Sequence, residues 1–165
     1  SEGWVFPMND RLRSMLGLAI LLLITFGSAS AQTLEITDGK ETLVLDRALL
    51  ESFPQSVIET TSPYYDGTAE FSGPTLARVI EHFGSTGASE VTLVALNGYK
   101  VSGSMKELMS LDAIVSTRQN GEPMSIRQRG PYWIMLPLSE RPELDSEDFH
   151  RYMVWQLNRI ELTQE

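Results

Sequence analysis

Arg127 to Leu138 reads RQRGPYWIMLPL, with two arginines before a Gly-Pro turn and an apolar segment after it. The apolar run that starts at Trp133 predicts a buried strand. Arg127 and Arg129 stand at the start of this strand, in a chain whose formal net charge is −9. Two interpretations are open for them: solvated surface charges, or guanidinium groups that bind an anion.

The segments on either side of this stretch also have the composition of strands. AIVSTR ends at Arg118 and precedes a turn at Asn120-Gly121, and VWQLNRIEL forms the last predicted strand. VTLVAL, residues 91–96, is apolar on both faces, which predicts a central strand. Asn97-Gly98 then predicts a tight hairpin that returns the chain along YKVSG.

The N-terminal half adds short helices to this set of strands. A hairpin is predicted around Asp38-Gly39, a helix capped by Asp46 follows, and residues 56–61 form a strand. Residues 74–84 carry an apolar stripe at helical spacing, and residues 104–107 match a capping box. Because strands and helices do not alternate regularly, we expect an α+β fold: a single domain of mixed β-sheet with short helices.

Residues 1–31 have the pattern of a leader. A basic region with Arg11 and Arg13 precedes an apolar run from Met15 to Phe26, and Ala29-Ser30-Ala31 suits signal peptidase. We therefore expect secretion to the periplasm with cleavage before Gln32, no stable membrane span afterwards, and one domain over residues 32–165. Residues 1–7 precede the first methionine and are interpreted as a non-native start. Retention of the run as an uncleaved anchor is the alternative.

Charge and cysteine content exclude several classes of partner. The charges of residues 1–31 cancel, so the whole negative charge belongs to residues 32–165. This balance argues against nucleic acid and anionic membranes, which need clustered lysine and arginine. The chain has no cysteine. It therefore has neither a disulfide nor a thiolate ligand for a soft metal.

No sequence motif indicates a particular reaction. G-x-S-x-G, H-E-x-x-H and glycine-rich phosphate loops are missing, so we predict no catalytic residue and no zinc or calcium site. His82 adjoins the apolar stripe of its predicted helix and is interpreted as a packing residue. His150 lies in a charged segment and is expected to be a solvated surface residue.

Polar and aromatic residues in predicted loops are the remaining candidates. TTSPYYDG, residues 60–67, reads as a turn-rich loop, and NGYK forms a hairpin tip. Aromatic walls with a few polar groups are typical of small-molecule sites, and guanidinium groups suit anions. Each residue alone is better explained by solvation or turn formation. Together they predict a ligand-binding face of Thr61, Ser62, Tyr64, Tyr65, Tyr99, Arg118, Arg127 and Arg129.

The order of these segments resembles the oxidoreductase molybdopterin-binding fold of the sulfite oxidase family. The resemblance spans most of residues 56–162, where short motifs occur in the order and at the spacing typical of the family. The matching residues are Phe71, Gly73, Leu76, Asn97, Gly98, Tyr99, Asn120, Gly121, Met124, Gly130, Pro131, Val154, Trp155 and Ile160. This resemblance implies a sulfite-oxidase-like fold and, in the family, a molybdopterin cofactor ligated by a cysteine.

Four departures from the family bear on its chemistry. Thr61 or Ser62 stands about where the ligand cysteine is expected, and a hydroxyl is a poor substitute for a thiolate. The domain is also shorter, and Trp133 replaces a positional arginine. Arg11-Leu12-Arg13 lacks the two adjacent arginines of the twin-arginine signal, which directs the export of folded proteins that carry a cofactor.

These departures favour one function over its alternatives. We expect a ligand- or partner-binding or sensory module that binds a small anionic or polar ligand or a periplasmic protein, without a molybdenum cofactor. The alternative is a periplasmic oxidoreductase that binds a molybdopterin-type cofactor without cysteine ligation. A scaffold domain with no small-molecule site is a third interpretation.

Overall fold

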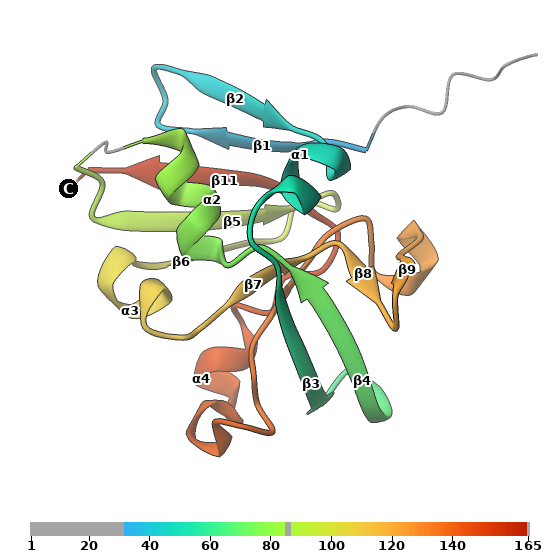
Figure 1. The fold of residues 1–165 in the computed structure, drawn as a ribbon. Coiled ribbons are helices and arrows are strands. Elements are labelled where there is room, and N and C mark those ends of the chain that lie inside the picture. Colours follow the sequence, from blue (N-terminus) through green and yellow to red (C-terminus); the bar gives the residue numbers. More distant parts are fainter. Residues whose placement is uncertain (1–31, 85–86, 165) are drawn as a thin grey trace, which may run out of the picture. The chain divides into compact units, whose positions relative to one another are not determined.

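The computed structural model describes residues 32–84 and 87–164. The predicted leader lies outside these residues. Within the described part of the chain, no helix combines the length and the apolar character needed to cross a membrane. The described residues form a mixed α+β fold in which strands dominate and the helices are short (Figure 1). The predicted fold class is therefore confirmed.

A five-stranded sheet forms one part of the domain. Its order is β2 (Thr42–Leu45), β1 (Leu34–Thr37), β11 (Leu157–Thr163), β5 (Glu90–Ala95) and β6 (Lys100–Ser104). β1 runs parallel to β11, and the other neighbours are antiparallel, so the sheet is mixed. Residues 91–95 are all buried, which confirms the predicted central strand. The predicted last strand begins later than expected, at Leu157.

A four-stranded sheet contains the largest departure from the prediction. Its order is β3 (Ser56–Ser62), β4 (Tyr65–Gly73), β8 (Arg118–Gln119) and β9 (Glu122–Pro123). Residues 60–67 do not form an extended loop, because β3 and β4 pair closely and only Pro63 and Tyr64 connect them. Ala69, Phe71 and Gly73 alternate as the buried face of β4.

The stretch from Arg127 to Leu138 forms part of a turn of 3-10 helix and then a strand. Ile126–Gln128 is η1, and Arg129 ends it in the left-handed conformation with φ 70. After a cis Gly130-Pro131 bond, β10 (Trp133–Met135) pairs with β7 (Ile114–Ser116). The strand is shorter than the predicted WIMLPL, although its residues are buried through Leu138. β7 and β8 divide the predicted strand at residues 113–118 between two sheets.

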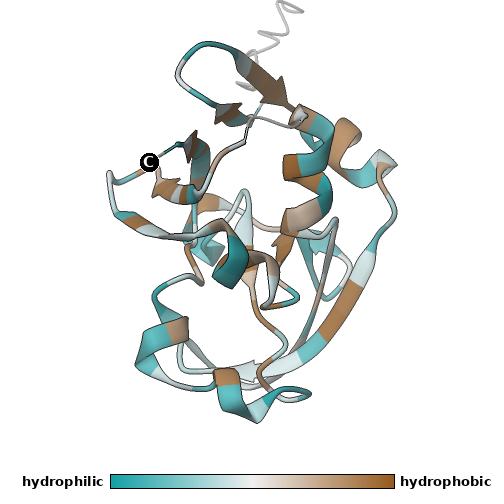
Figure 2. Ribbon diagram, turned by 90° about the vertical axis from the view of Figure 1, so that its left-hand side faces the viewer, coloured by the Kyte–Doolittle hydropathy of each residue, from teal (hydrophilic) through white to brown (hydrophobic). Residues whose placement is uncertain are grey.

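Short helices connect the sheets, and local capping defines their ends. α1 (Arg47–Ser52) is capped by Asp46, whose carboxylate accepts the amide of Leu49. α3 (Met105–Met109) is capped by Ser104, as predicted. α2 (Leu76–Phe83) buries the predicted stripe, and bands of hydrophobic and hydrophilic residues alternate along the helices and strands (Figure 2). The remaining helices are η2 (Pro142–Leu144) and α4 (Glu147–His150).

The two histidines are not placed as predicted. His82 is exposed, although its ring still packs 4.9 Å from that of Phe53. His150 is partly buried, and its Nε2 lies 2.6 Å from Oδ1 of Asp145. The end of α4 turns this ring inward, a tertiary effect that the charged sequence around it does not reveal.

Candidate functional site

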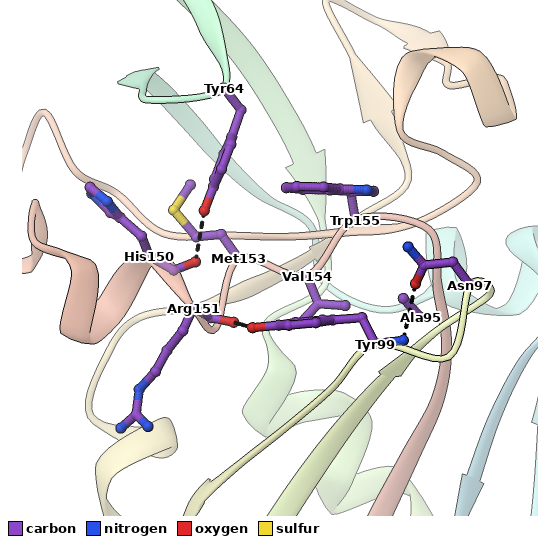
Figure 3. A pocket seen from close by; sticks show the side chains of 9 residues that line it. All are labelled: Tyr64, Ala95, Asn97, Tyr99, His150, Arg151, Met153, Val154 and Trp155. Carbon is purple, nitrogen blue, oxygen red and sulfur yellow. Dashed lines mark hydrogen bonds between the residues drawn. The ribbon is translucent and has the colours of Figure 1, made fainter.

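An aromatic cleft of about 210 Å³ opens where three distant segments meet (Figure 3). The turn between β3 and β4, the turn between β5 and β6, and the chain after α4 form its walls. We call this site the aromatic cleft. Its lining residues are Tyr64, Ala95, Asn97, Tyr99, His150, Arg151, Met153, Val154 and Trp155.

The predicted Asn97-Gly98 turn holds one wall of the aromatic cleft in place. Gly98 has φ 85, a conformation that favours glycine, and the side-chain oxygen of Asn97 accepts the amide of Tyr99 at 3.0 Å. The Tyr99 hydroxyl donates to the carbonyl of Arg151 at 3.2 Å. The ring of Tyr99 is thus fixed at both ends, and Figure 3 draws it edge-on below the ring of Trp155.

Tyr64 forms the opposite side of the aromatic cleft. Its amide donates to the hydroxyl of Ser62, and its own hydroxyl donates to the carbonyl of His150 at 3.2 Å. Its ring lies edge-on to Trp155 with centroids 5.0 Å apart. Burial and the nearby Tyr99 raise the pKa of Tyr64, while Arg129 acts in the opposite direction. The hydroxyl is therefore protonated at neutral pH and acts as a donor.

The polar groups of the aromatic cleft are mostly neutral. The amide nitrogen of Asn97 has no hydrogen-bond partner among the described residues and can donate to a ligand. Among the described residues that line the cleft, Arg151 is the one permanent cation, but its guanidinium points away from the cleft in Figure 3. It donates to the carbonyl of Asp148 and to the hydroxyl of Tyr152. No carboxylate belongs to the described residues that line the cleft. The arrangement therefore suits a neutral, weakly polar group with an apolar body.

A second hollow of about 390 Å³ is lined by a neighbouring set of aromatic residues. We call it the charged hollow, because Arg129 and Glu122 both line it. Tyr65, Met124 and Trp133 are among its other walls. The ring of Trp133 lies 6.1 Å from that of Tyr65 and 6.3 Å from that of Tyr64. One aromatic cluster therefore separates the charged hollow from the aromatic cleft.

The predicted ligand-binding residues do not form one continuous face. Tyr64 and Tyr99 line the aromatic cleft, and Tyr65 and Arg129 line the charged hollow. Arg127 is exposed in η1 and lines neither. Their role in ligand binding stays a prediction.

Thr61 and Ser62 are used within the fold. The amide of Thr61 donates to the hydroxyl of Ser139 at 3.0 Å, and the hydroxyl of Ser62 accepts the amide of Tyr64. Arg118 is also engaged, because its Nε donates to Glu51 at 2.8 Å and its Nη1 to the carbonyl of Gly121. The hydrogen bond to Glu51 raises the pKa of Arg118. These contacts stabilise the fold and leave Arg118 outside both sites.

Several residues of the aromatic cleft were not predicted from the sequence. Trp155 was assigned to a strand, His150 to the surface and Met153 to no site, whereas all three line the cleft. The sequence signal for these residues was weak, because it consisted of Trp155 in one of the motifs that support the family resemblance. Asn97 was recognised as a turn residue, and its free amide became visible only in three dimensions.

The family model for the oxidoreductase molybdopterin binding domain matches residues 44–139. The chain belongs to this family. A solved structure with a similar fold is the sulfane dehydrogenase SoxCD from Paracoccus pantotrophus, with a TM-score of 0.62 and 17% sequence identity. The match covers 82% of this chain and 39% of that one, so the likeness concerns the fold. No match is found among the curated proteins.

The donor set of this chain does not fit a thiolate-ligated molybdenum, which the resemblance to the sulfite oxidase family implies. No cysteine is present, and the hydroxyls near the expected position, on Thr61 and Ser62, already contact Ser139 and Tyr64. Most arginines in the described residues are also occupied. Arg47, Arg78, Arg118, Arg141, Arg151 and Arg159 contact acceptor groups of the protein.

Proposed function

We propose that this family member is an exported binding module that holds a small ligand in the aromatic cleft without molybdenum catalysis. The observation that carries the proposal is the cleft itself, in which Tyr64, Tyr99 and Trp155 surround a space with one free amide donor. In this role the domain acts as a ligand- or partner-binding or sensory module of the periplasm.

The dimensions of the aromatic cleft define the size of its ligand. A cavity of roughly 150 Å³ accepts benzene, so about 210 Å³ suits a group of one or two rings. Asn97 supplies N–H donors at one end, and the hydroxyls of Tyr64 and Tyr99 retain lone pairs that accept hydrogen bonds. A small polar ligand with an apolar body satisfies these groups better than a strongly charged one.

A protein partner is the other occupant that the surface supports. Leu96 is 50% exposed and Tyr99 is 47% exposed, both at the turn that forms one wall of the aromatic cleft. Ile126 is also exposed. Gln156 connects it to Leu96, because the backbone carbonyl of Gln156 accepts the amide of Leu96 and its side-chain amide donates to the carbonyl of Ile126. An apolar side chain of a partner would bury this rim and enter the cleft.

The alternative function is that of an oxidoreductase with a molybdopterin-type cofactor held without cysteine ligation. Family membership favours it, since the family is described by this cofactor. The lack of a thiolate and the engagement of Thr61, Ser62 and Arg118 argue against it. A measurement of metal content separates the two functions.

The experiment is native mass spectrometry and elemental analysis of protein purified from its own host. We expect a small organic adduct without stoichiometric molybdenum, and we expect Tyr99→Ala to lose the adduct. Val57→Ala is the matched control, because Val57 is 62% exposed on edge strand β3 and lines neither site. One molybdenum per chain would refute the proposal. Retention of the adduct by Tyr99→Ala would place the ligand elsewhere.

A second measurement does not depend on a ligand that survives purification. In an NMR screen of one- and two-ring neutral fragments, we expect shifts of the Asn97 side-chain amide and the Trp155 indole. Shifts confined to residues outside the aromatic cleft, or no shifts at all, would contradict the proposed site.

A further inference from the structure

The guanidinium of Arg129 is held in place without an acceptor. Its central carbon lies 5.5 Å from the ring centroid of Trp133 and 5.6 Å from that of Trp155. Its backbone is fixed on both sides, by the amide of Gln156 donating to its carbonyl and by its own amide donating to Ile126. Among the described arginines, only Arg127 and Arg129 make no side-chain hydrogen bond or ion pair.

Opposite charge faces Arg129 across the charged hollow. Glu122 lies on the short hairpin of β8 and β9, whereas Arg129 lies at the end of η1. Both line the same hollow, and no ion pair within 4.0 Å joins Glu122 to any cation of the described residues, although Arg118, which is paired with Glu51, interacts with Glu122 at longer range. The two walls therefore present separate charges, with a gap between them that neither side chain closes.

Neutral hydrogen-bonding groups accompany the two charges. The side-chain oxygen of Gln128 accepts the amide of Ser125, and that of Asn120 accepts the amide of Glu70. Each amide nitrogen then has no partner among the described residues and can donate to a ligand. Buried Met124 and the ring of Trp133 add an apolar surface to the hollow.

We propose that the charged hollow binds a small zwitterion, a molecule with a carboxylate and an ammonium group such as a free amino acid. The carboxylate accepts hydrogen bonds from Arg129, whose planar fork suits two parallel contacts. The ammonium group donates to Glu122, and a small apolar side chain lies against Trp133. A simple anion interacts favourably only with Arg129, and it leaves the carboxylate of Glu122 facing a second negative charge.

This site goes beyond the proposed function, because it uses residues that do not line the aromatic cleft. Strain in the backbone supports it. Four of the non-glycine residues described have positive φ, namely Asp112, Asn120, Arg129 and Gln156, and two of them, Asn120 and Arg129, line the charged hollow. Such conformations are strained and concentrate at functional sites.

Titration calorimetry with three matched probes tests the proposal on the unmodified protein. L-alanine carries both charges, acetate only the negative one, and ethylammonium only the positive one. We expect L-alanine to bind at least about tenfold more tightly than acetate or ethylammonium, since it satisfies both walls. Equal affinity for L-alanine and acetate, or no binding of L-alanine, would overturn the proposal regardless of how any variant folds.

Two charge-removing variants with matched controls locate the site. Glu122→Gln should weaken L-alanine binding by about tenfold without weakening acetate, and Arg129→Gln should weaken both. Glu59→Gln is the acidic control, an exposed glutamate on β3, and Arg127→Gln is the basic control two residues from Arg129. Equal losses in Glu59→Gln and Glu122→Gln would reduce the effect to net charge and refute the assigned contacts.

The calorimetry and the variants test the charged hollow separately from the proposed function of the aromatic cleft. Fragment shifts at Asn97 and Trp155 with no L-alanine binding would leave the aromatic cleft intact and refute only the zwitterion site. L-alanine binding that Arg129→Gln removes and Tyr99→Ala preserves would support the charged hollow alone.

Discussion

Replacing Gly73 with alanine tests how the sheets fit together around Trp133. A Cβ on Gly73 would stand 2.0 Å from the carbonyl oxygen of Val115, whereas ordinary contact starts near 3.4 Å. The two backbones must therefore separate by about 1.4 Å, and neither atom belongs to a flexible side chain. This separation moves β4 away from β7, the strand that pairs with β10 and Trp133.

Two effects of Gly73→Ala oppose each other. The alanine lowers the entropy of the unfolded chain, which stabilises the fold by about 0.4–1 kcal/mol. Overpacking against a backbone atom typically costs about 1–3 kcal/mol and sometimes more. Because the required shift is large, we expect a net loss of about 3 kcal/mol in the free energy of unfolding. This loss corresponds to a fall in melting temperature of roughly 10 °C.

Urea unfolding followed by circular dichroism measures this loss. Thr68→Ala is the control, because Thr68 is exposed on the same strand and should change stability by less than about 0.5 kcal/mol. Gly67→Ala gives a second comparison: its φ of 74 strains an alanine, but no atom lies within 4 Å of the new Cβ. If Gly73→Ala unfolds within about 0.5 kcal/mol of the unmodified protein, the close approach to Val115 is wrong.

Three further substitutions test the interior and its charges. Tyr152→Phe removes a hydroxyl that donates to Glu107 at 2.6 Å, and we expect unfolding to become easier by about 1–2 kcal/mol in urea titrations. Ser116→Ala removes the buried hydrogen bond to the carbonyl of Trp133, and calorimetry should show a loss of about 1 kcal/mol. Burial raises the pKa of Glu51, but Arg118, Thr117 and Arg47 outweigh it, so the pKa lies below its ordinary value of 4.5. The stability contributed by Glu51 is therefore complete above about pH 4.5 and is lost as pH falls through the lowered pKa. Glu51→Gln should reduce this loss of stability at acid pH. If the loss is unchanged, it belongs to other carboxylates.

Local signals were predictable from the sequence because each depends on neighbouring residues. Asp46 and Ser104 cap their helices as expected, and the Asn97-Gly98 turn forms where the dipeptide indicates it. Strand β4 was missed because two glycines and several polar residues weaken its pattern. Its pairing with β3, as in Glu59 opposite Glu70, determines the strand.

The candidate site depended on contacts that sequence proximity does not reveal. Arg118 read as a free cation at the end of a strand, yet its partner Glu51 lies 67 positions earlier in the chain. The aromatic cleft joins Tyr64, Tyr99 and Trp155 from three segments, so no single stretch contains its pattern. Family resemblance identified the fold, but these tertiary contacts separated residues that had been grouped as one face.

The two tyrosines of the aromatic cleft bond to consecutive carbonyls, those of His150 and Arg151. Tyr64 comes from the hairpin of the four-stranded sheet, and Tyr99 comes from the hairpin of the five-stranded sheet. A molecule seated between them therefore contacts two hairpins that are already joined through one peptide segment. Amide hydrogen exchange should slow at both hairpins together when the cleft is filled, so that occupancy of one site would change the rigidity of two sheets.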